Sequence, residues 1–390
     1  MTATDEEASE PAAGVDALAE VDALVDAGRR APGSDAERRA ARHLEQRLAD
    51  LGRPSETEGF AVHQAWPLSY AILAGLAVAG SLLSVSVPVA GAALALAAAL
   101  LTFLEASSLV PTLRRLLGRR ASQNVVSWSE TGKPGALVLV AHCDAGRAGI
   151  AHSDRTARRR VPIGGLQLLF WAELAVLACS LARLAGFDGT PLTAVQFVPT
   201  VVLIAGIALL TDVALAGTKG GENDNASGAA LVLRLAERFG GGLEHFDVHV
   251  VFTGAQKAGA AGMRDFLRRH GGQRLDTEAT VFLNVDEVGS GSVRYTRREG
   301  ALVTVASHVQ LLALCDETDA EPLVSRSASD AYAARAAGFP AITVTCRERR
   351  DYASGRVDEQ ALERAESFCA DLIERLDAEV GPGLSRPTAP

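Results

Sequence analysis

The sequence has little cysteine and almost no lysine. Its five cysteines are odd in number and none has CxxC spacing, so neither a disulfide framework nor a cysteine-ligated zinc site is expected. Lysine occurs only at Lys133, Lys219 and Lys257 among 38 basic residues, against 47 acidic ones. The net charge of −9 and the lack of a basic stripe with interleaved aromatics argue against a nucleic-acid partner. No Walker or dinucleotide-type glycine motif occurs either.

Charged residues are missing from one long stretch. Between Gly59 and Leu104 there is no Asp, Glu, Lys or Arg, and Pro88 divides the stretch near its middle. A membrane helix needs about 20 apolar residues, so we expect two transmembrane hairpins of two helices each. The four expected helices are residues 67–87, 89–106, 163–184 and 192–213. Buried helices of a soluble domain are the alternative, but two long hairpins exceed what one core absorbs.

Basic residues predict the orientation of these helices. Arginines and one lysine flank the ends of the hairpins that join the polar sequence, whereas the two opposite turns hold only Arg183. The positive-inside rule then predicts a multi-pass protein of the cell membrane with its globular part in the cytoplasm. The acidic start has no signal-peptide pattern. Anionic lipid headgroups are the partners that best explain the juxtamembrane arginines. Glu173, inside the third helix, is a functional candidate or a residue that joins helices.

The polar sequence predicts one α/β domain that the hairpins interrupt. Buried-strand patterns such as ALVLVAHCD and ATVFLNVD alternate with helical patterns such as NASGAALVLRLAERFG. This alternation favours a three-layer domain with a mostly parallel, mixed sheet and helices on both faces. The segment PGSDAERRAARHLEQRLADLG predicts a helix that opens with Ser34 and Glu37 at capping-box spacing and closes on Gly52. The expected boundaries are 1–66, 107–162 and 214–380 for the domain, 67–106 and 163–213 for the hairpins, and 381–390 for a disordered tail.

Three short segments place metal-competent side chains where expected strands give way to loops. They are VAHCDAG with His142, ENDNASG with Asp224 and FLNVDEVG with Asp286. Ligands of such folds gather at the carboxyl ends of strands. One His and two Asp form a nitrogen and oxygen set suited to zinc or a similar divalent ion. Taken singly, His142 is also consistent with a packed histidine, Asp224 with a helix cap, and Asp286 with a loop acid.

An ordered series of motifs carries a family resemblance. The series is RAPGSDAERRAARHLEQRLADLG, SQNVV, LVAHCD, DNASGAALVLRLAE, VVFTGAQKAG, NVDEVG, SDAYAARAAGFPAI and DYASGRVD. It resembles the two-zinc aminopeptidases of peptidase family M28, which includes leucyl aminopeptidase, glutamate carboxypeptidase and, more distantly, glutaminyl cyclase. The resemblance spans nearly all the polar sequence, with the hairpins as insertions. It implies a zinc-peptidase fold and a hydrolytic site.

The resemblance also implies roles for single residues. His142 and Asp286 match ligands of one zinc, and Asp224 matches the carboxylate that bridges two zinc ions. If His142 binds a metal ion, Asp144 is expected to orient its ring; a turn residue is the alternative. Gln256 stands where the family has its general-base Glu. Two positions of the second zinc have lost their ligands, Lys257 in place of Glu and Ala353 in place of His.

These replacements predict a degenerate site. An amide cannot take a proton from water near neutral pH, and general-base help is typically worth about 100- to 10,000-fold in rate. We therefore expect at most one zinc ion, with Lys257 supplying part of the lost positive charge beside Asp224. The favoured hypothesis is a membrane protein whose peptidase-like domain is inactive or weakly active and binds a peptide, a partner or one metal ion.

Two other hypotheses stay open. The first is a working one-metal aminopeptidase in which His142, Asp224 and Asp286 hold zinc while Lys257 or Gln256 positions a peptide. In that case Glu287 is the carboxylate that would substitute for the lost base. The second is a transporter built on the four helices, which their small number and scattered polar residues disfavour.

Overall fold

The computed structural model describes residues 14–107, 112–150, 164–347 and 357–384. Within these residues nine strands form one sheet in the order β1-β2-β4-β3-β5-β9-β6-β7, and β8 pairs with β6. The strands are β1 (Glu56–Val62), β2 (Arg120–Ser127), β3 (Gly135–His142), β4 (Phe246–Thr253), β5 (Thr280–Val285), β6 (Ser292–Glu299), β7 (Val305–Ala306), β8 (Glu321–Ser325) and β9 (Ala341–Arg347).

The centre of the sheet is parallel and its borders are mixed. Strands β4, β3, β5 and β9 run parallel, whereas β1 and β2 form antiparallel pairs at one border. At the other border β6 is antiparallel to β9 and β7 and parallel to β8. The central strands are continuous apolar runs because helices cover both faces, which explains LVLV in β3 and VFLNV in β5. The expectation of a mostly parallel, mixed sheet is confirmed.

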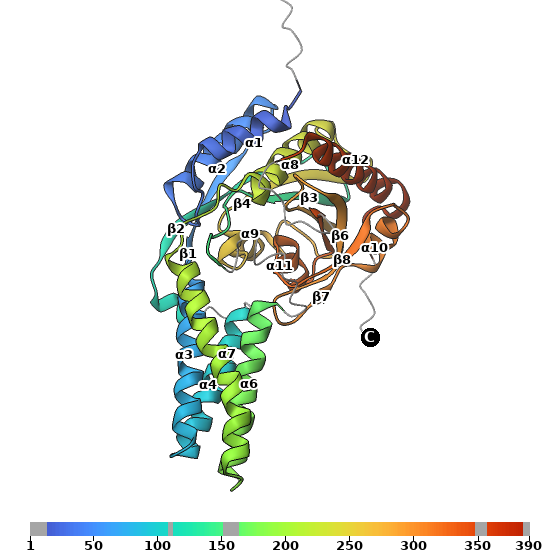
Figure 1. Cartoon of the computed structure of the whole chain (residues 1–390). Helices are drawn as coiled ribbons and strands as arrows, with labels where there is room; N and C mark the ends of the chain where they lie inside the picture. The colour runs from blue at the N-terminus through green and yellow to red at the C-terminus, as the bar shows by residue number, and fades with distance from the viewer. Residues whose placement is uncertain (1–13, 108–111, 151–163, 348–356, 385–390) are drawn as a thin grey trace, which may run out of the picture.

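Helices cover both faces of this sheet (Figure 1). One hydrophobic cluster joins the sheet to five helices, and a second joins it to two others. The first set is α1 (Ala17–Asp26), α2 (Asp35–Asp50), α8 (Ser227–Arg238), α10 (Val309–Asp316) and α12 (Glu359–Arg375). The second set is α9 (Ala261–His270) and α11 (Asp330–Ala336). Short helical turns lie at Leu113–Leu116, Glu222–Ala226, Gln256–Ala258 and Leu376–Val380.

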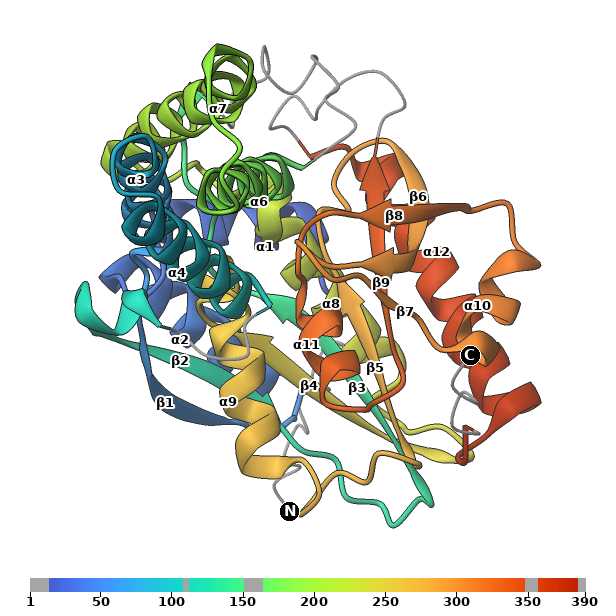
Figure 2. The same cartoon turned by 90° about the horizontal axis from the view of Figure 1, so that it is seen from below.

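Four long apolar helices form a separate bundle that projects from the globular part (Figure 1). They are α3 (Trp66–Ser84), α4 (Pro88–Ala106), α6 (Gly165–Leu184) and α7 (Thr190–Leu215). All four are long and apolar enough to cross a membrane. Figure 2, viewed from the bundle end, shows them gathered at one side of the globular part.

Small residues let the first two bundle helices pack closely. A Cβ atom on Gly91 would lie only 2.4 Å from the Cα atom of Ser84, and one on Gly80 would lie 2.9 Å from the backbone of Ala95. Such close approach of helix backbones is typical of helix pairs in membranes. Glu173 is fully buried within the bundle, where it accepts a hydrogen bond of 3.0 Å from the Thr102 hydroxyl.

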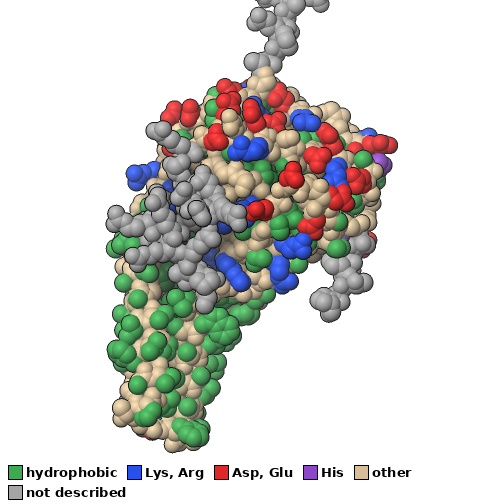
Figure 3. All heavy atoms as spheres, turned by 45° about the vertical axis from the view of Figure 1, so that its right-hand side comes forward, with side chains coloured by type: hydrophobic (Ala, Val, Ile, Leu, Met, Phe, Trp, Pro, Cys, Tyr) green, Lys and Arg blue, Asp and Glu red, His purple; other side chains and the backbone are tan. Residues whose placement is uncertain are grey.

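The outer surface of the bundle is unlike that of the globular part (Figure 3). Hydrophobic side chains dominate it, while acidic and basic side chains gather on the globular part. Large apolar side chains such as Leu82, Trp171 and Phe197 are more than 60% exposed. A water-soluble domain rarely exposes an apolar surface of this extent.

Candidate metal centre

Three side chains converge at the carboxyl edge of the sheet. His142 is the last residue of β3, Asp286 follows β5 directly, and Asp224 lies in the turn before α8. One ligand atom from each lies within 4.8 Å of the other two. Because β3 and β5 are parallel neighbours, their ends deliver His142 and Asp286 to the same edge. The expected His/Asp/Asp group is therefore assembled by the fold.

The distances within this group fit one tetrahedral ion. The Nε2 atom of His142 lies 3.3 Å from an oxygen of Asp224 and 3.3 Å from an oxygen of Asp286. Two ligands on a tetrahedral zinc with bonds of about 2.0–2.1 Å lie about 3.3 Å apart. The residues present thus fit a single zinc ion, which would take Nε2 of His142 and one oxygen from each carboxylate.

The hydrogen-bond partners of His142 indicate which of its ring nitrogens carries a proton. Its Nδ1 atom lies 2.9 Å from the main-chain oxygen of Asp144 and 3.2 Å from the Asp144 carboxylate, so it carries a proton and donates. Nε2 is then left to a metal or to a second proton. Burial and Lys257 lower the pKa of His142, but hydrogen bonds to Asp144, Asp224 and Asp286 outweigh them and raise it well above its usual range. A proton and a metal ion therefore compete for Nε2.

Lys257 lies directly on the expected bridging carboxylate. Its Nζ atom is 2.7 Å from the same Asp224 oxygen that faces His142. Burial would lower the pKa of Lys257, but the charges of Asp224, Asp286 and Glu287 raise it, so the side chain is an ammonium ion. Desolvation raises the pKa of Asp224 in turn, and Lys257 and His142 more than reverse this effect. Asp224 is therefore ionised, and it does not cap α8, whose N-terminus has no side-chain cap.

Gln256 is held by its amide nitrogen, which donates a 3.1 Å hydrogen bond to the main-chain oxygen of Ala328. The amide oxygen is buried, and no hydrogen-bond donor within the described parts of the chain reaches it. An amide oxygen of this kind can accept a hydrogen bond or face a cation, but it cannot act as a base near neutral pH.

Asp144 anchors the loop that carries Gln256 and Lys257. One carboxylate oxygen accepts from the backbone N–H of Gln256 at 2.9 Å, and the other accepts from that of Lys257 at 2.9 Å. The same side chain touches His142. The loop begins and ends with alanines in the left-handed region, Ala255 at φ 53° and Ala260 at φ 52°. Such unfavourable backbone conformations cluster at functional sites.

Two buried charged residues that sequence reasoning missed support the site from behind. Arg30 is fully buried and donates to the main-chain oxygens of Cys143 at 2.9 Å and Gly221 at 2.8 Å, next to His142 and close to Asp224. Glu37 accepts from Ala255 N–H at 2.8 Å. Burial and then the charge of Asp144 raise the pKa of Glu37 to about 8. The capping-box spacing is the only signal that pointed at Glu37, and half of it holds, since Ser34 accepts from Glu37 N–H at 3.2 Å.

A third buried acid lies behind the strand ends. Asp330 is the first residue of α11 and accepts a 2.5 Å hydrogen bond from the Thr253 hydroxyl, which lies at the end of β4. Burial raises the pKa of Asp330 to about 7. Its neighbour Ser329 caps α11 by accepting from Tyr332 N–H at 3.3 Å. These residues support the site without reaching the group of ligands.

Of three other candidate residues, one lies outside the described residues, one lies away from the centre and one faces it. Ala353, which replaces the second-zinc histidine, lies in the undescribed segment 348–356, so the second-ion half is described only at Gln256 and Lys257. His249 lies mid-strand in β4 and accepts from Ser129 N–H at 3.1 Å. Glu287 faces the centre; burial and Asp224 raise its pKa, although Arg347 lies 3.9 Å away.

A cavity of about 390 Å³ opens onto these residues. Asp224, Gln256, Lys257, Asp286 and Glu287 line one wall. The opposite wall comes from the ends of the bundle, where α3 contributes Trp66 and Tyr70, α4 contributes Glu105 and Ala106, and α6 contributes Leu166. The metal centre therefore lies at the junction of the bundle and the globular part.

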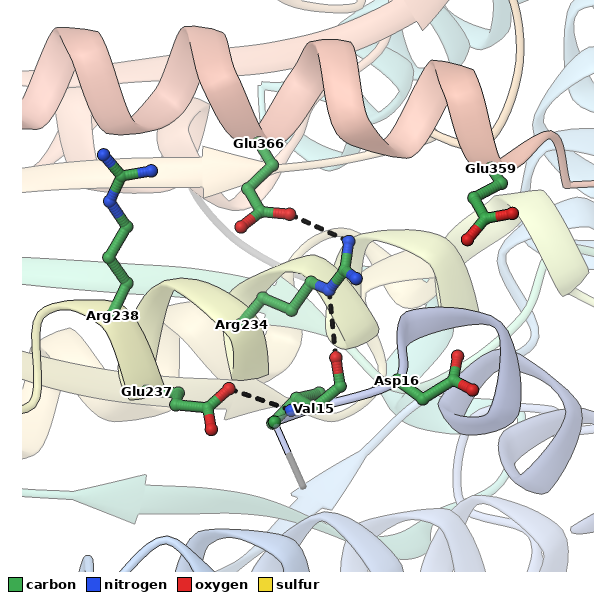
Figure 4. A pocket seen from close by; sticks show the side chains of 8 residues that line it. Val15, Asp16, Arg234, Glu237, Arg238, Glu359 and Glu366 are labelled. Carbon is green, nitrogen blue, oxygen red and sulfur yellow. Dashed lines mark hydrogen bonds and ion pairs between the residues drawn. The ribbon is translucent and has the colours of Figure 1, made fainter. Parts of the chain in front are cut away.

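A second surface hollow, near the start of α1, is not a rival site (Figure 4). Several of its charged groups bind one another or the main chain. Arg234 lies 2.9 Å from Glu366 and donates to the oxygen of Val15, while Glu237 accepts from Val15 N–H at 2.9 Å. These contacts join the start of α1 to α8 and α12, and no group of metal ligands is found there among the described residues.

Part of the chain resembles a known peptidase family. The profile of peptidase family M28 matches residues 206–365, which include Asp224, Gln256, Lys257 and Asp286 but not His142. This match spans less than half of the 390 residues. No curated protein matches the chain.

Solved structures extend the likeness to nearly the whole chain. An aminopeptidase from Aneurinibacillus sp. strain AM-1 is 12% identical with a TM-score of 0.54, and the match covers 96% of this chain and 97% of that one. A Zn-dependent exopeptidase from Parabacteroides distasonis is 11% identical with a TM-score of 0.51, covering 95% and 100%. A glutaminyl cyclase from Bacteroides thetaiotaomicron, 11% identical with a TM-score of 0.51, covers 93% and 98%. At these identities the likeness establishes a zinc-aminopeptidase-like fold.

Proposed function

We propose that the chain is a membrane-anchored member of the M28-like metallopeptidases that binds one metal ion and has lost ordinary peptidase turnover. The observation that carries the proposal is the ammonium of Lys257, 2.7 Å from the Asp224 carboxylate. Asp224 is the residue that would bridge two ions, and here it already has a cationic partner. The ligands His142, Asp224 and Asp286 remain for one ion.

The charges of the centre support one ion rather than two. Asp224 and Asp286 contribute two negative charges and Lys257 one positive charge, so one negative charge remains when His142 is neutral. A single divalent cation more than compensates this remainder, while a second one would meet Lys257 at short range. When bound, zinc would act as a Lewis acid that polarises a ligand oxygen.

The identity of Gln256 supports the loss of turnover. Gln256 holds the loop position of the expected general base, and its amide cannot take a proton from water. Its side chain instead binds the main chain at Ala328. We therefore assign to the domain a binding role, in which the cavity receives a ligand beside the metal.

The bundle supports membrane anchoring. Its four helices have the length and hydropathy of membrane spans, and their outward side chains are largely apolar. The arginines near the domain ends of the hairpins favour a cytoplasmic globular part. A carbonate wash tests the anchoring: we expect the full-length protein to stay with the membrane pellet, and its release would refute this part of the proposal.

Metal analysis and peptide hydrolysis test the rest of the proposed function. We expect about one zinc per chain in purified protein, little release of amino acids from short peptides, and loss of zinc in His142→Ala. The triple variant Gln256→Glu, Lys257→Glu, Ala353→His should raise bound zinc towards two. Unchanged zinc content in the triple variant would count against the assignment of these positions.

One observation favours an active one-metal aminopeptidase as the second candidate. Glu287 lines the cavity, and burial together with Asp224 raises its pKa towards the range in which a carboxylate is an effective base. Peptide hydrolysis that disappears in both Glu287→Gln and His142→Ala would establish this function and overturn the inactive one.

A further inference from the structure

The cavity above the metal centre lies at the level where the bundle would leave a membrane. Trp66 and Tyr70 lie in the first turns of α3, Ala106 ends α4, and Leu166 begins α6. A helix of 19 residues, the length of α3, spans about 28 Å, close to the hydrocarbon thickness of about 30 Å. If α3 crosses the bilayer, its Trp66 end lies among the lipid headgroups, where Trp and Tyr are enriched.

The acidic groups that line the cavity already have partners. Asp224 binds Lys257 at 2.7 Å, and Asp286 faces His142 at 3.3 Å. The remaining two acids are Glu105, 2.7 Å from Arg114, and Glu287, 3.9 Å from Arg347.

Among the described residues, two cations that line the same cavity have no acidic partner. The guanidinium of Arg147 donates to the main-chain oxygens of Ala214 and Gln64, which carry no net charge. Lys219 is exposed, and its ammonium makes no hydrogen bond or ion pair with any residue in the described ranges. The two lie on adjacent segments, because Arg147 forms a bridge with Thr218 and Lys219 N–H donates to Gly146 at 2.9 Å. The cavity therefore carries an excess of positive charge beside an apolar wall.

We propose that this cavity binds the anionic headgroup of a phospholipid from the surrounding leaflet. The phosphate lies with Arg147 and Lys219, and the acyl part lies on the side of Trp66, Tyr70 and Leu166. A volume of about 390 Å³ accommodates a headgroup and not a whole lipid, so the chains remain in the bilayer. This inference rests on the membrane insertion contained in the proposed function, and it names the ligand of the binding role.

The scarcity of lysine makes a direct test practical. The full-length protein is placed in nanodiscs of phosphatidylcholine alone or with a minority of phosphatidylglycerol, and lysines are acylated and quantified by mass spectrometry. We expect phosphatidylglycerol to lower the acylation of Lys219 about fivefold, the factor expected for one basic residue at an anionic surface. Lys133, which is exposed in the β2–β3 turn, is the internal control and should not change. Equal acylation of Lys219 in both lipids would overturn the inference.

A matched pair of variants separates the cavity from general surface attraction. Ala301 lines the cavity, while Val303 lies in the same loop with 47% of its surface exposed and does not line it. Ala301→Trp should abolish the protection of Lys219 by filling the space, and Val303→Trp should leave it intact. Protection that survives Ala301→Trp would place the lipid outside the cavity and refute the proposal.

A further experiment with a soluble phosphate ester distinguishes a lipid headgroup from a free phosphate ester as the ligand. Glycerol 3-phosphate is added to the phosphatidylcholine nanodiscs, and it should give no protection because it lacks acyl chains. Full protection by glycerol 3-phosphate would assign the site to a soluble phosphate and overturn the lipid. Stable reconstitution with bound zinc but without protection refutes this inference alone, whereas release from membranes on carbonate washing refutes the proposed anchoring as well.

Discussion

The two sides of the metal centre differ in chemistry but not in construction. On one side the ends of β3 and β5 and the turn before α8 present His142, Asp286 and Asp224, a complete set for one ion. On the other side the loop from Ala255 to Ala260 presents an amide and an ammonium. Both sides are joined through Asp144, which contacts His142 and holds the loop by two hydrogen bonds.

Under the proposed function, this comparison teaches that the frame of a two-ion site can persist without its second ion. The Asp144 carboxylate binds main-chain N–H groups of the loop, and these bonds do not depend on which side chains the loop carries. The side chains of Gln256 and Lys257 can therefore set the chemistry of the loop without changing these main-chain bonds. The ammonium of Lys257 compensates the charge of Asp224, which would otherwise be a half-buried carboxylate beside a second one.

The largest effect on zinc affinity is expected from removing a side chain of the His142, Asp224 and Asp286 group. His142→Ala removes the only nitrogen ligand from the group, so zinc affinity should fall by more than about 100-fold, the upper range for loss of a residue that merely supports a ligand. His249→Ala is the control, because His249 lies mid-strand away from the centre. Zinc titration by calorimetry measures both; a small loss in His142→Ala would show that the ion is held elsewhere.

Removing the ammonium of Lys257 should change zinc affinity in the opposite direction. Lys257→Met eliminates a cation next to Asp224, and zinc affinity should rise by at least about tenfold because charge repulsion at short range is worth several kcal/mol. Lys219→Met, in the same cavity but without an acidic partner, should change zinc affinity much less. If Lys257→Met weakens zinc binding, the lysine supports the ion and does not replace one.

Breaking the link that Asp144 makes between the two sides of the centre should have a moderate effect on stability and zinc affinity. In Asp144→Asn one oxygen must serve where two now accept from Gln256 and Lys257 N–H, so one buried donor loses its partner at a cost of about 1–3 kcal/mol. Zinc affinity should fall by about tenfold through disorder of His142. Thermal unfolding and zinc titration are measured on the same variant. An unchanged unfolding temperature and an unchanged zinc affinity would show that Asp144 does not connect the two sides of the centre.

The smallest effect concerns the pH dependence of stability. The pKa of Asp330 is about 7 in the folded protein and about 3.9 in an unfolded chain, so the folded state holds the proton more tightly. Its contribution is fully present below about pH 4 and is lost as the pH rises through 7. Asp330→Asn should therefore flatten the fall in unfolding temperature between pH 5 and pH 8. An unchanged slope would mean that Asp330 is ionised throughout.

Much of the fold and of the ligand group could be predicted from local patterns. Continuous apolar runs identified β3 and β5, and the charge-free stretch identified α3 and α4 close to their observed ends. His142 and Asp286 stand directly at strand ends, where parallel strands bring ligands together. The roles of Lys257 and Gln256 were predicted only through the family resemblance. Their loop shows no periodicity, and its left-handed alanines break the usual residue preference.

The sequence by itself determined the elements, the four apolar helices and the chemical types available to the centre, because these depend on periodicity, composition and residue order. Only the tertiary structure decided that Arg30 and Glu37 lie buried behind the centre, since their partners are main-chain groups far away in the chain. It also decided that the ends of the bundle form a wall of the cavity. The bundle residues of that wall lie about 60 to 220 positions from Asp224 to Glu287 in the chain, and no local pattern encodes a distance across the fold.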